Sequence, residues 1–152
     1  MMRYQVEIKN VEAMRVAYTK YKGEVKRANK VFPSVFKAIR GNSNGAPFFT
    51  YYSMNLETKE GELELCVPTE AEPEIKGIEV KVMPRVKALS VTHIGPYETL
   101  DEAYATLQTY ALQNGIRLVL PYREIYIKGP GMMFKGNPEK YITEILYPIE
   151  EA

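Results

Sequence analysis

The sequence predicts an α+β fold in which one small unit is used twice, and three observations support this prediction. The order strand, helix, strand, strand can be read across residues 13–68 and again across residues 86–148. Alternating apolar and polar residues mark the strands, and apolar residues three and four apart mark the helices. A chain of 152 residues, 45% of them hydrophobic, has the size of one globular domain. We therefore expect a single domain over residues 1–152, with repeats at about 1–70 and about 78–152.

The first repeat follows a leading strand, RYQVEIKN. Its predicted elements are a strand AMRVAYTKYKG, a helix NKVFPSVFKAIRG, and two strands, APFFTYYSM and GELELCVP. Pro33 would break a helix interior, but a helix that begins near Asn29 places this proline in or next to the first turn, where a missing N–H costs little. We therefore expect the first helix to end at Gly41 and to be shorter than the second.

The second repeat follows a polar connector, TEAEPEIKG, and its own leading strand, IEVKVMP. Its predicted elements are a strand VKALSVTHIG, a helix TLDEAYATLQTYALQNG, and two strands, PYREIYIKG and NPEKYITEILYP. Thr99 and Glu102 have the spacing of a capping box, and Gly115 follows the last turn. These signals make this the best-defined helix of the chain.

A mid-strand carboxylate recurs in both repeats. Aligning Cys66-Val67-Pro68 with Leu146-Tyr147-Pro148 places Glu64 opposite Glu144 and, one strand earlier, Tyr51 opposite Tyr126. A matched position in two copies suggests a shared role rather than a surface accident.

Two interpretations of Glu144 remain open. It shares a strand face with Ile142 and Leu146, so burial would cost free energy unless a cation or a hydrogen-bond donor met the carboxylate. With a cationic ligand it would be ionised, and without one burial favours the protonated acid, which could act as a general acid. Alternatively, it lies on an exposed edge or pairs with a lysine such as Lys128. For Glu64 the exposed alternative is stronger, because the neighbouring Glu62 lies on the same strand face.

The bulk composition excludes several classes of protein. A net charge of +1 gives no general attraction to nucleic acid or to an anionic membrane. No apolar run is long enough to span a bilayer, and the first residues lack the apolar segment of a signal peptide, so we expect a cytoplasmic protein. One cysteine, Cys66, and one distant histidine, His93, make a metal site improbable. We expect Cys66 to be an ordinary small core or cleft residue and His93 to hydrogen-bond the turn that follows it.

Aromatic and apolar residues provide candidates for a binding surface. The chain has 12 tyrosines and no tryptophan, and a tyrosine ring can hold a cation over its face. Tyr126 and Tyr51 either line a cavity or are core residues, and Tyr97 either lines it or anchors the turn before the second helix. Residues 132–134, Met-Met-Phe between glycines, either form a lid over ligands or tuck into the core.

Several motifs together resemble the GyrI-like small-molecule-binding domains, which also occur as effector-binding halves of multidrug-responsive transcription activators. The motifs are HIGPYETLDEAY, YREIY, NPEKYITEILYPI, PFFTYY and ELELCVP. The resemblance implies an SHS2-type fold: two βαββ units related by a pseudo-twofold axis, antiparallel sheets with helices on one face, and a ligand cleft on the other, between the halves. Tyr141 stands where many members have Trp, and Asn137 where many have Asp, which bears on ligand size and loop geometry.

The resemblance also implies a binding function for bulky lipophilic or cationic aromatic molecules, with a buried glutamate that looks like Glu144. The expected partner is such a small molecule, without a cofactor, metal, nucleic acid or membrane, and with a separate protein such as a regulator or gyrase as a further partner. The expected ligand-binding residues are Glu144, Tyr126, Tyr51, Glu64, Phe49, Tyr97, Met133 and Phe134.

Two other functions remain as alternatives. Similar stand-alone proteins hydrolyse cyclopropane-containing genotoxins, and Glu144 with Tyr126 or Tyr51 would then be catalytic. Proteins of similar fold bind haem, but the chain's single imidazole, His93, gives a tetrapyrrole little support.

Overall fold

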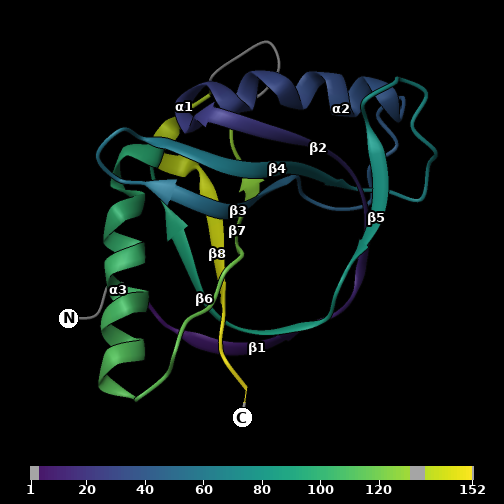
Figure 1. Ribbon diagram of the computed structural model, residues 1–152. Helices are drawn as coiled ribbons and strands as arrows, with labels where there is room; N and C mark the ends of the chain where they lie inside the picture. Colours follow the sequence, from purple (N-terminus) through teal and green to yellow (C-terminus); the bar gives the residue numbers. More distant parts are fainter. Residues whose placement is uncertain (1–3, 131–135, 152) are drawn as a thin grey trace. The chain divides into compact units, whose positions relative to one another are not determined.

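The computed structural model describes residues 4–130 and 136–151 and shows an α+β fold (Figure 1). The chain divides into two compact units: an N-terminal unit of residues 12–85, and a C-terminal unit that combines the first strand, up to Val11, with the chain from Val86 onward. Each unit contains a four-stranded antiparallel sheet with helical segments packed on one face. The predicted α+β class is confirmed.

The N-terminal unit has the strand order β3-β4-β2-β5. Its strands are β2 (Met14–Glu24), β3 (Phe48–Asn55), β4 (Glu60–Pro68) and β5 (Glu79–Met83). Its helical segments are α1 (Val25–Ala28), a 3-10 turn (Asn29–Val31) and α2 (Phe32–Ala38). The segment α2 packs on β4 and β2, where Val35 and Ile39 meet Ala17 and Val67 in a buried cluster.

The first helix is broken into short segments rather than continuous from Asn29. Pro33 lies in the first turn of α2, as predicted, because a proline there removes an N–H that has no partner within the helix. With 7 residues against the 14 of the helix α3 in the other unit, α2 is also the shorter of the two.

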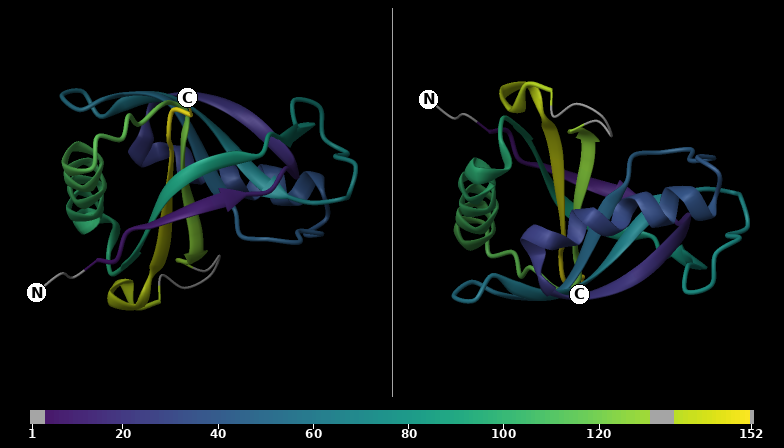
Figure 2. Two further views of the ribbon diagram at one scale, coloured as in Figure 1. Left: turned by 90° about the horizontal axis from the view of Figure 1, so that it is seen from below. Right: turned by 90° about the horizontal axis from the view of Figure 1, so that it is seen from above.

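The C-terminal unit has the strand order β1-β6-β8-β7. Its strands are β1 (Glu7–Val11), β6 (Val86–Ile94), β7 (Tyr122–Lys128) and β8 (Ile142–Pro148). Its helical segments are a 3-10 turn (Tyr97–Thr99), α3 (Leu100–Gln113) and a second 3-10 turn (Pro138–Lys140). The helix α3 lies along β6 and β8 (Figure 2), and Leu107 packs there against Leu89, Val91 and Ile145.

Two local predictions for this unit are wrong. Thr99 makes no capping hydrogen bond to the start of α3, because its hydroxyl donates to the carbonyl of Pro96 and contacts the ring of His93. The last strand begins at Ile142 rather than near Asn137, since a 3-10 turn occupies Pro138–Lys140 and Asn137 caps it.

The two leading strands are exchanged between the sequence repeats. The strand β1 precedes the first repeat but pairs with β6, and β5 precedes the second repeat but pairs with β2. Each unit therefore takes its edge strand from the segment that leads the other repeat. The boundaries expected for the repeats, about 1–70 and about 78–152, stay a prediction.

Candidate functional site

Glu64 and Glu144 occupy equivalent positions in the two sheets. Glu64 on β4 lies opposite Thr50 of β3 and Lys20 of β2. Glu144 on β8 lies opposite Ile125 of β7 and Thr92 of β6. Because side chains alternate between the faces of a strand, both glutamates point away from the face that carries the helices. We call this side of each sheet the helix-free face.

Each glutamate is met by a lysine from the exchanged edge strand. The Lys9 ammonium on β1 donates to Glu144 at 2.7 Å, and the Lys81 ammonium on β5 donates to Glu64 at 2.5 Å. The two lysines are themselves equivalent, since Lys9 lies opposite Ala88 of β6 and Lys81 lies opposite Val16 of β2. Lys9 rather than Lys128 is thus the ion-pair partner of Glu144.

The surroundings of Glu144 are polar. Its side chain is 14% exposed, and the hydroxyl of Ser90 donates to the same carboxylate oxygen, Oε2, at 2.6 Å. The hydrogen bond to Glu144 raises the pKa of Lys9 above its ordinary value, against the opposing effect of burial. The Glu144 carboxylate is thus met by both a cation and a hydrogen-bond donor, Lys9 and Ser90, from its own unit.

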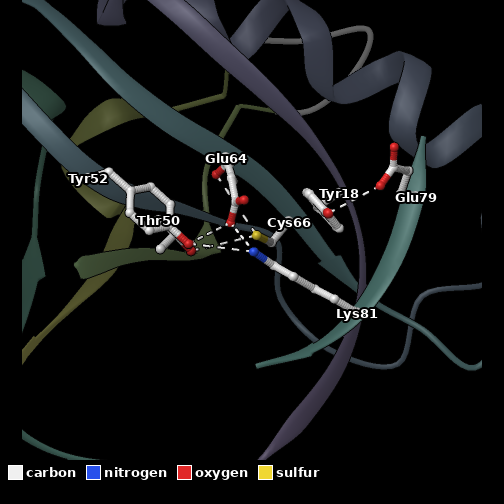
Figure 3. Close-up of polar contacts among 7 residues, drawn as sticks. All are labelled: Tyr18, Thr50, Tyr52, Glu64, Cys66, Glu79 and Lys81. Carbon is white, nitrogen blue, oxygen red and sulfur yellow. Dashed lines mark hydrogen bonds and ion pairs between the residues drawn. The ribbon is translucent and has the colours of Figure 1, made fainter. Parts of the chain in front are cut away.

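The surroundings of Glu64 are aromatic (Figure 3). Its side chain is 7% exposed, and the hydroxyl of Tyr52 donates to it at 2.9 Å. The Lys81 nitrogen that binds Glu64 lies 4.4 Å from the ring centre of Tyr18 and 6.0 Å from that of Tyr52. Tyr18 occupies the position equivalent to Ser90, because each lies two pairs along the ladder from the pair that contains the lysine. Among residues 4–130 and 136–151, rings that can hold a cation lie beside the lysine of the Glu64 pair, and a serine takes the equivalent position beside Glu144.

Burial and neighbouring charges set the protonation states of Lys81, Tyr52 and Tyr18 in this cluster. Burial lowers the pKa of Lys81, but the hydrogen bond and charge of Glu64 outweigh it, and the net pKa is raised. Burial, reinforced by Glu64, raises the pKa of Tyr52, and burial with the nearby charge of Glu79 raises that of Tyr18. At neutral pH the cluster is an ammonium between two neutral phenols.

A surface depression of about 650 Å³ adjoins the Glu64 cluster. It extends over β2, β3 and β4 of the N-terminal unit. Its lining residues are Lys20, Tyr21, Lys22, Tyr52, Glu62, Leu63 and Glu64. The depression exposes one side of the cluster to a molecule from solution.

Tyr126 belongs to a different cluster, on the helix-bearing face of the C-terminal unit. It lies opposite Thr143 on β8, so it points to the face opposite Glu144, and the structure does not bring these two side chains together. Its hydroxyl instead donates to Glu124 at 2.7 Å, and the hydroxyl of Tyr104 on α3 donates to the same carboxylate. Glu124 is 7% exposed. Sequence reasoning did not select it, although the alternation in YREIY places Glu124 and Tyr126 on one face.

Tyr51 and Phe49 also lie on a helix-bearing face. Tyr51 lies opposite Leu63, so it points away from Glu64, and its ring meets that of Phe49 edge to face at 5.9 Å. Phe49 stacks on Phe32 of α2 at 5.1 Å. The tyrosine that reaches Glu64 is instead Tyr52, where the β3–β4 ladder contains an irregularity.

Tyr97 packs at the turn before α3. Its ring lies 5.7 Å from that of Tyr126 and 5.2 Å from that of Tyr141, and burial raises its pKa to about 12. His93 is fully buried and bonds the turn through Pro96, as predicted. Met133 and Phe134 lie outside the described residues.

Metal ligands, membrane spans and the cysteine can be checked in the described part of the chain. Across residues 4–130 and 136–151, no group of three or more His, Cys, Asp or Glu side chains could hold a metal ion. In the same residues, no helix is long and apolar enough to cross a membrane. Cys66 is fully buried and contacts the hydroxyl of Thr50 at 3.6 Å.

The fold and the buried glutamates agree with a sequence match to a known class of domain. The model of the GyrI-like small molecule binding domain matches residues 4–150. The chain therefore belongs to the GyrI-like family. No protein with a curated description matches it.

Solved structures extend the comparison. The chain is 25% identical to EcmrR, whose structure was solved in a complex with DNA, and the TM-score is 0.84. The match covers 100% of this chain and 59% of EcmrR. It is 26% identical to the crystal structure of the EcmrR C-terminal domain, with a TM-score of 0.82, covering 99% of this chain and 100% of that one. The chain thus spans about three fifths of EcmrR and corresponds to its C-terminal domain.

Two more distant structures share the fold alone. A hydrolase from Listeria innocua is 13% identical with a TM-score of 0.69, over 96% of this chain and 92% of that one. SAV2435, solved with tetraphenylphosphonium bound, is 17% identical with a TM-score of 0.61, over 98% of this chain and 94% of that one.

Proposed function

We propose that this GyrI-like domain binds bulky lipophilic or cationic aromatic small molecules on the helix-free faces that carry Glu144 and Glu64. The observation that supports this proposal most is the Glu64 cluster. A carboxylate with 7% side-chain exposure holds an ammonium group whose nitrogen is 4.4 Å from a tyrosine ring centre. The cluster therefore has the chemical groups that an organic cation requires.

The energetics favour a ligand that carries both charge and aromatic surface. A cation over an aromatic ring gains about 0.5–2 kcal/mol, more as the site excludes water. Aromatic groups of the ligand add the free energy of burying apolar area, roughly 25 cal/mol per Å². Tetraphenylphosphonium, which SAV2435 binds, combines these properties. We propose drug or toxin sensing or sequestration in the cytoplasm as the role, with a regulator or gyrase as partner where a response is required.

The proposal is tested by titrating the protein with tetraphenylphosphonium in a calorimeter. We expect binding that weakens at least about tenfold in Glu144→Gln or Glu64→Gln, because each substitution removes a negative charge and keeps the shape. Glu74→Gln is the matched control, since Glu74 is 55% exposed in its pair with Arg40 and does not line the depression beside Glu64. Absence of binding, or equal binding by all four proteins, would contradict the proposal.

A hydrolase is the second candidate, and the contact between Tyr126 and Glu124 favours it. In a strained cyclopropane substrate, Glu124 would remove a proton from water as the oxygen bonds one ring carbon, and Tyr126 would protonate the carbon released by the broken C–C bond. Tyr126 and Glu124 are already hydrogen-bonded at 2.7 Å, whereas Tyr126 and Glu144 lie on opposite faces of the sheet. Incubation with a cyclopropane genotoxin, followed by mass spectrometry, should show a product heavier by one water. An unchanged compound would remove this candidate.

A further inference from the structure

We propose that Lys81 is a tethered occupant of an organic-cation site at Glu64 and sets the charge selectivity of that site. An alkylammonium or arylammonium ligand binds there by displacing the lysine ammonium from beside Tyr18 and Tyr52. This inference rests on the proposed binding function and names the side chain that regulates it.

The Lys81 ammonium already has the contacts of a bound cation. Its nitrogen lies 2.5 Å from Glu64 and 3.5 Å from the hydroxyl of Tyr52. The ring centre of Tyr18 is 4.4 Å away. Carboxylate and aromatic faces together are how proteins recognise ligand ammonium groups. A foreign cation at this point would meet the same carboxylate charge and the same ring faces, and one that carries N–H groups could also donate the same hydrogen bonds.

The Lys81 ammonium can move away from Glu64 without unfolding the sheet. Lys81 lies in a five-residue strand, β5, at the edge of its sheet, and is carried on a flexible four-carbon stem. Its side chain is 28% exposed. On the same strand, Glu79 accepts a hydrogen bond from Tyr18 at 3.3 Å. That carboxylate is two residues from Lys81 on the same strand face, and it offers the displaced ammonium a second acceptor.

The equivalent pair in the C-terminal unit shows that a lysine in this position does not by itself create a ring-lined site. Lys9 reaches Glu144 from the same register, but Ser90 stands where the N-terminal unit has Tyr18. Lys9 is also more exposed, at 42%. The duplicated fold thus supplies the ion pair twice, and the aromatic surroundings belong to Glu64. Lys9 provides a matched control within the same chain.

Displacement of Lys81 has a cost that lowers the apparent affinity for cations. A ligand must replace an ion pair that is already formed, so removing the competing ammonium strengthens its binding. A neutral aromatic molecule does not replace the ammonium beside Glu64, so its affinity should change little when Lys81 is substituted. Lys20, which lies opposite Glu64 on β2, is a nearby ammonium that could replace Lys81 beside Glu64 after substitution.

The experiment compares phenyltrimethylammonium with its uncharged isostere tert-butylbenzene by NMR titration. We expect Lys81→Met to bind the cation roughly tenfold or more tightly than the wild-type protein, and Lys9→Met to match the wild type. The isostere should bind all three alike. The double variant Lys20→Met/Lys81→Met should keep the gain, and Glu64→Gln/Lys81→Met should lose it. No gain in Lys81→Met and in the lysine double variant, or an equal gain in Lys9→Met, would overturn the proposal.

A second readout uses the wild-type protein and so does not depend on the variant folding. Saturation with phenyltrimethylammonium should release Lys81 and speed its acylation by an N-hydroxysuccinimide ester, measured by peptide mass spectrometry. The acylation rate of Lys9 serves as reference. Protection of Lys81, or an unchanged rate at saturation, would overturn the proposal. Failure of either readout while tetraphenylphosphonium still binds the wild type would leave the proposed function standing.

Discussion

The ion pair between Lys81 and Glu64 should contribute more to folding stability than its equivalent between Lys9 and Glu144. Exposed pairs contribute about 0.2–1 kcal/mol, and removing one partner of a fully buried pair costs about 3–5 kcal/mol. Side-chain exposures of 28% and 7% place the first pair between these limits, whereas 42% and 14% place the second nearer the surface value. We expect coupling energies of about 2 and about 1 kcal/mol respectively.

Two double-mutant cycles measure these coupling energies. The substitutions are Lys81→Met with Glu64→Gln, and Lys9→Met with Glu144→Gln, each followed by urea unfolding monitored by circular dichroism. A cycle isolates the pairwise term, because effects common to each single variant cancel. Equal coupling in both cycles, or a larger value for the pair of Lys9, would refute the argument from burial and aromatic contact.

Two further outcomes concern tyrosines of the C-terminal unit. Tyr97 has an ordinary pKa of 10.0 that burial raises to about 12, so the stability it contributes is complete below pH 10 and is lost as the pH rises towards 12. The free energy of unfolding should therefore fall more steeply with pH in the wild type than in Tyr97→Phe over that range. Tyr126→Phe removes a hydroxyl that donates to buried Glu124, and should lower the free energy of unfolding by about 1.5–3 kcal/mol, measured in urea. A change below about 0.5 kcal/mol would mean that this bond is not stabilising.

Local patterns predicted most of the secondary structure. Alternation in GELELCVP and in the last strand identified β4 and β8, and it also placed Glu64 and Glu144 at equivalent positions. Helical periodicity identified α3, which ends at Gln113 before Gly115. These features depend on residues close in sequence, which is why one strand or helix at a time could be read.

The partners of the glutamates could not be read in the same way. Lys9 and Lys81 are 135 and 17 residues from Glu144 and Glu64, and they reach them because the leading strands exchange sheets. Sequence periodicity contains no information on which strands pair. For the same reason the sequence points to Tyr51 rather than Tyr52, since the register between β3 and β4 decides which tyrosine faces Glu64.

A crystal structure of the protein soaked with the cation used in the calorimetric titration tests the central claim most directly. The account predicts electron density for the cation on a helix-free face, in contact with Glu64 or Glu144, and, for a cation at Glu64, with Lys81 moved away from the carboxylate. A cation bound on the helix-bearing face beside Glu124, or bound at Glu64 while the pair with Lys81 remains intact, would contradict it.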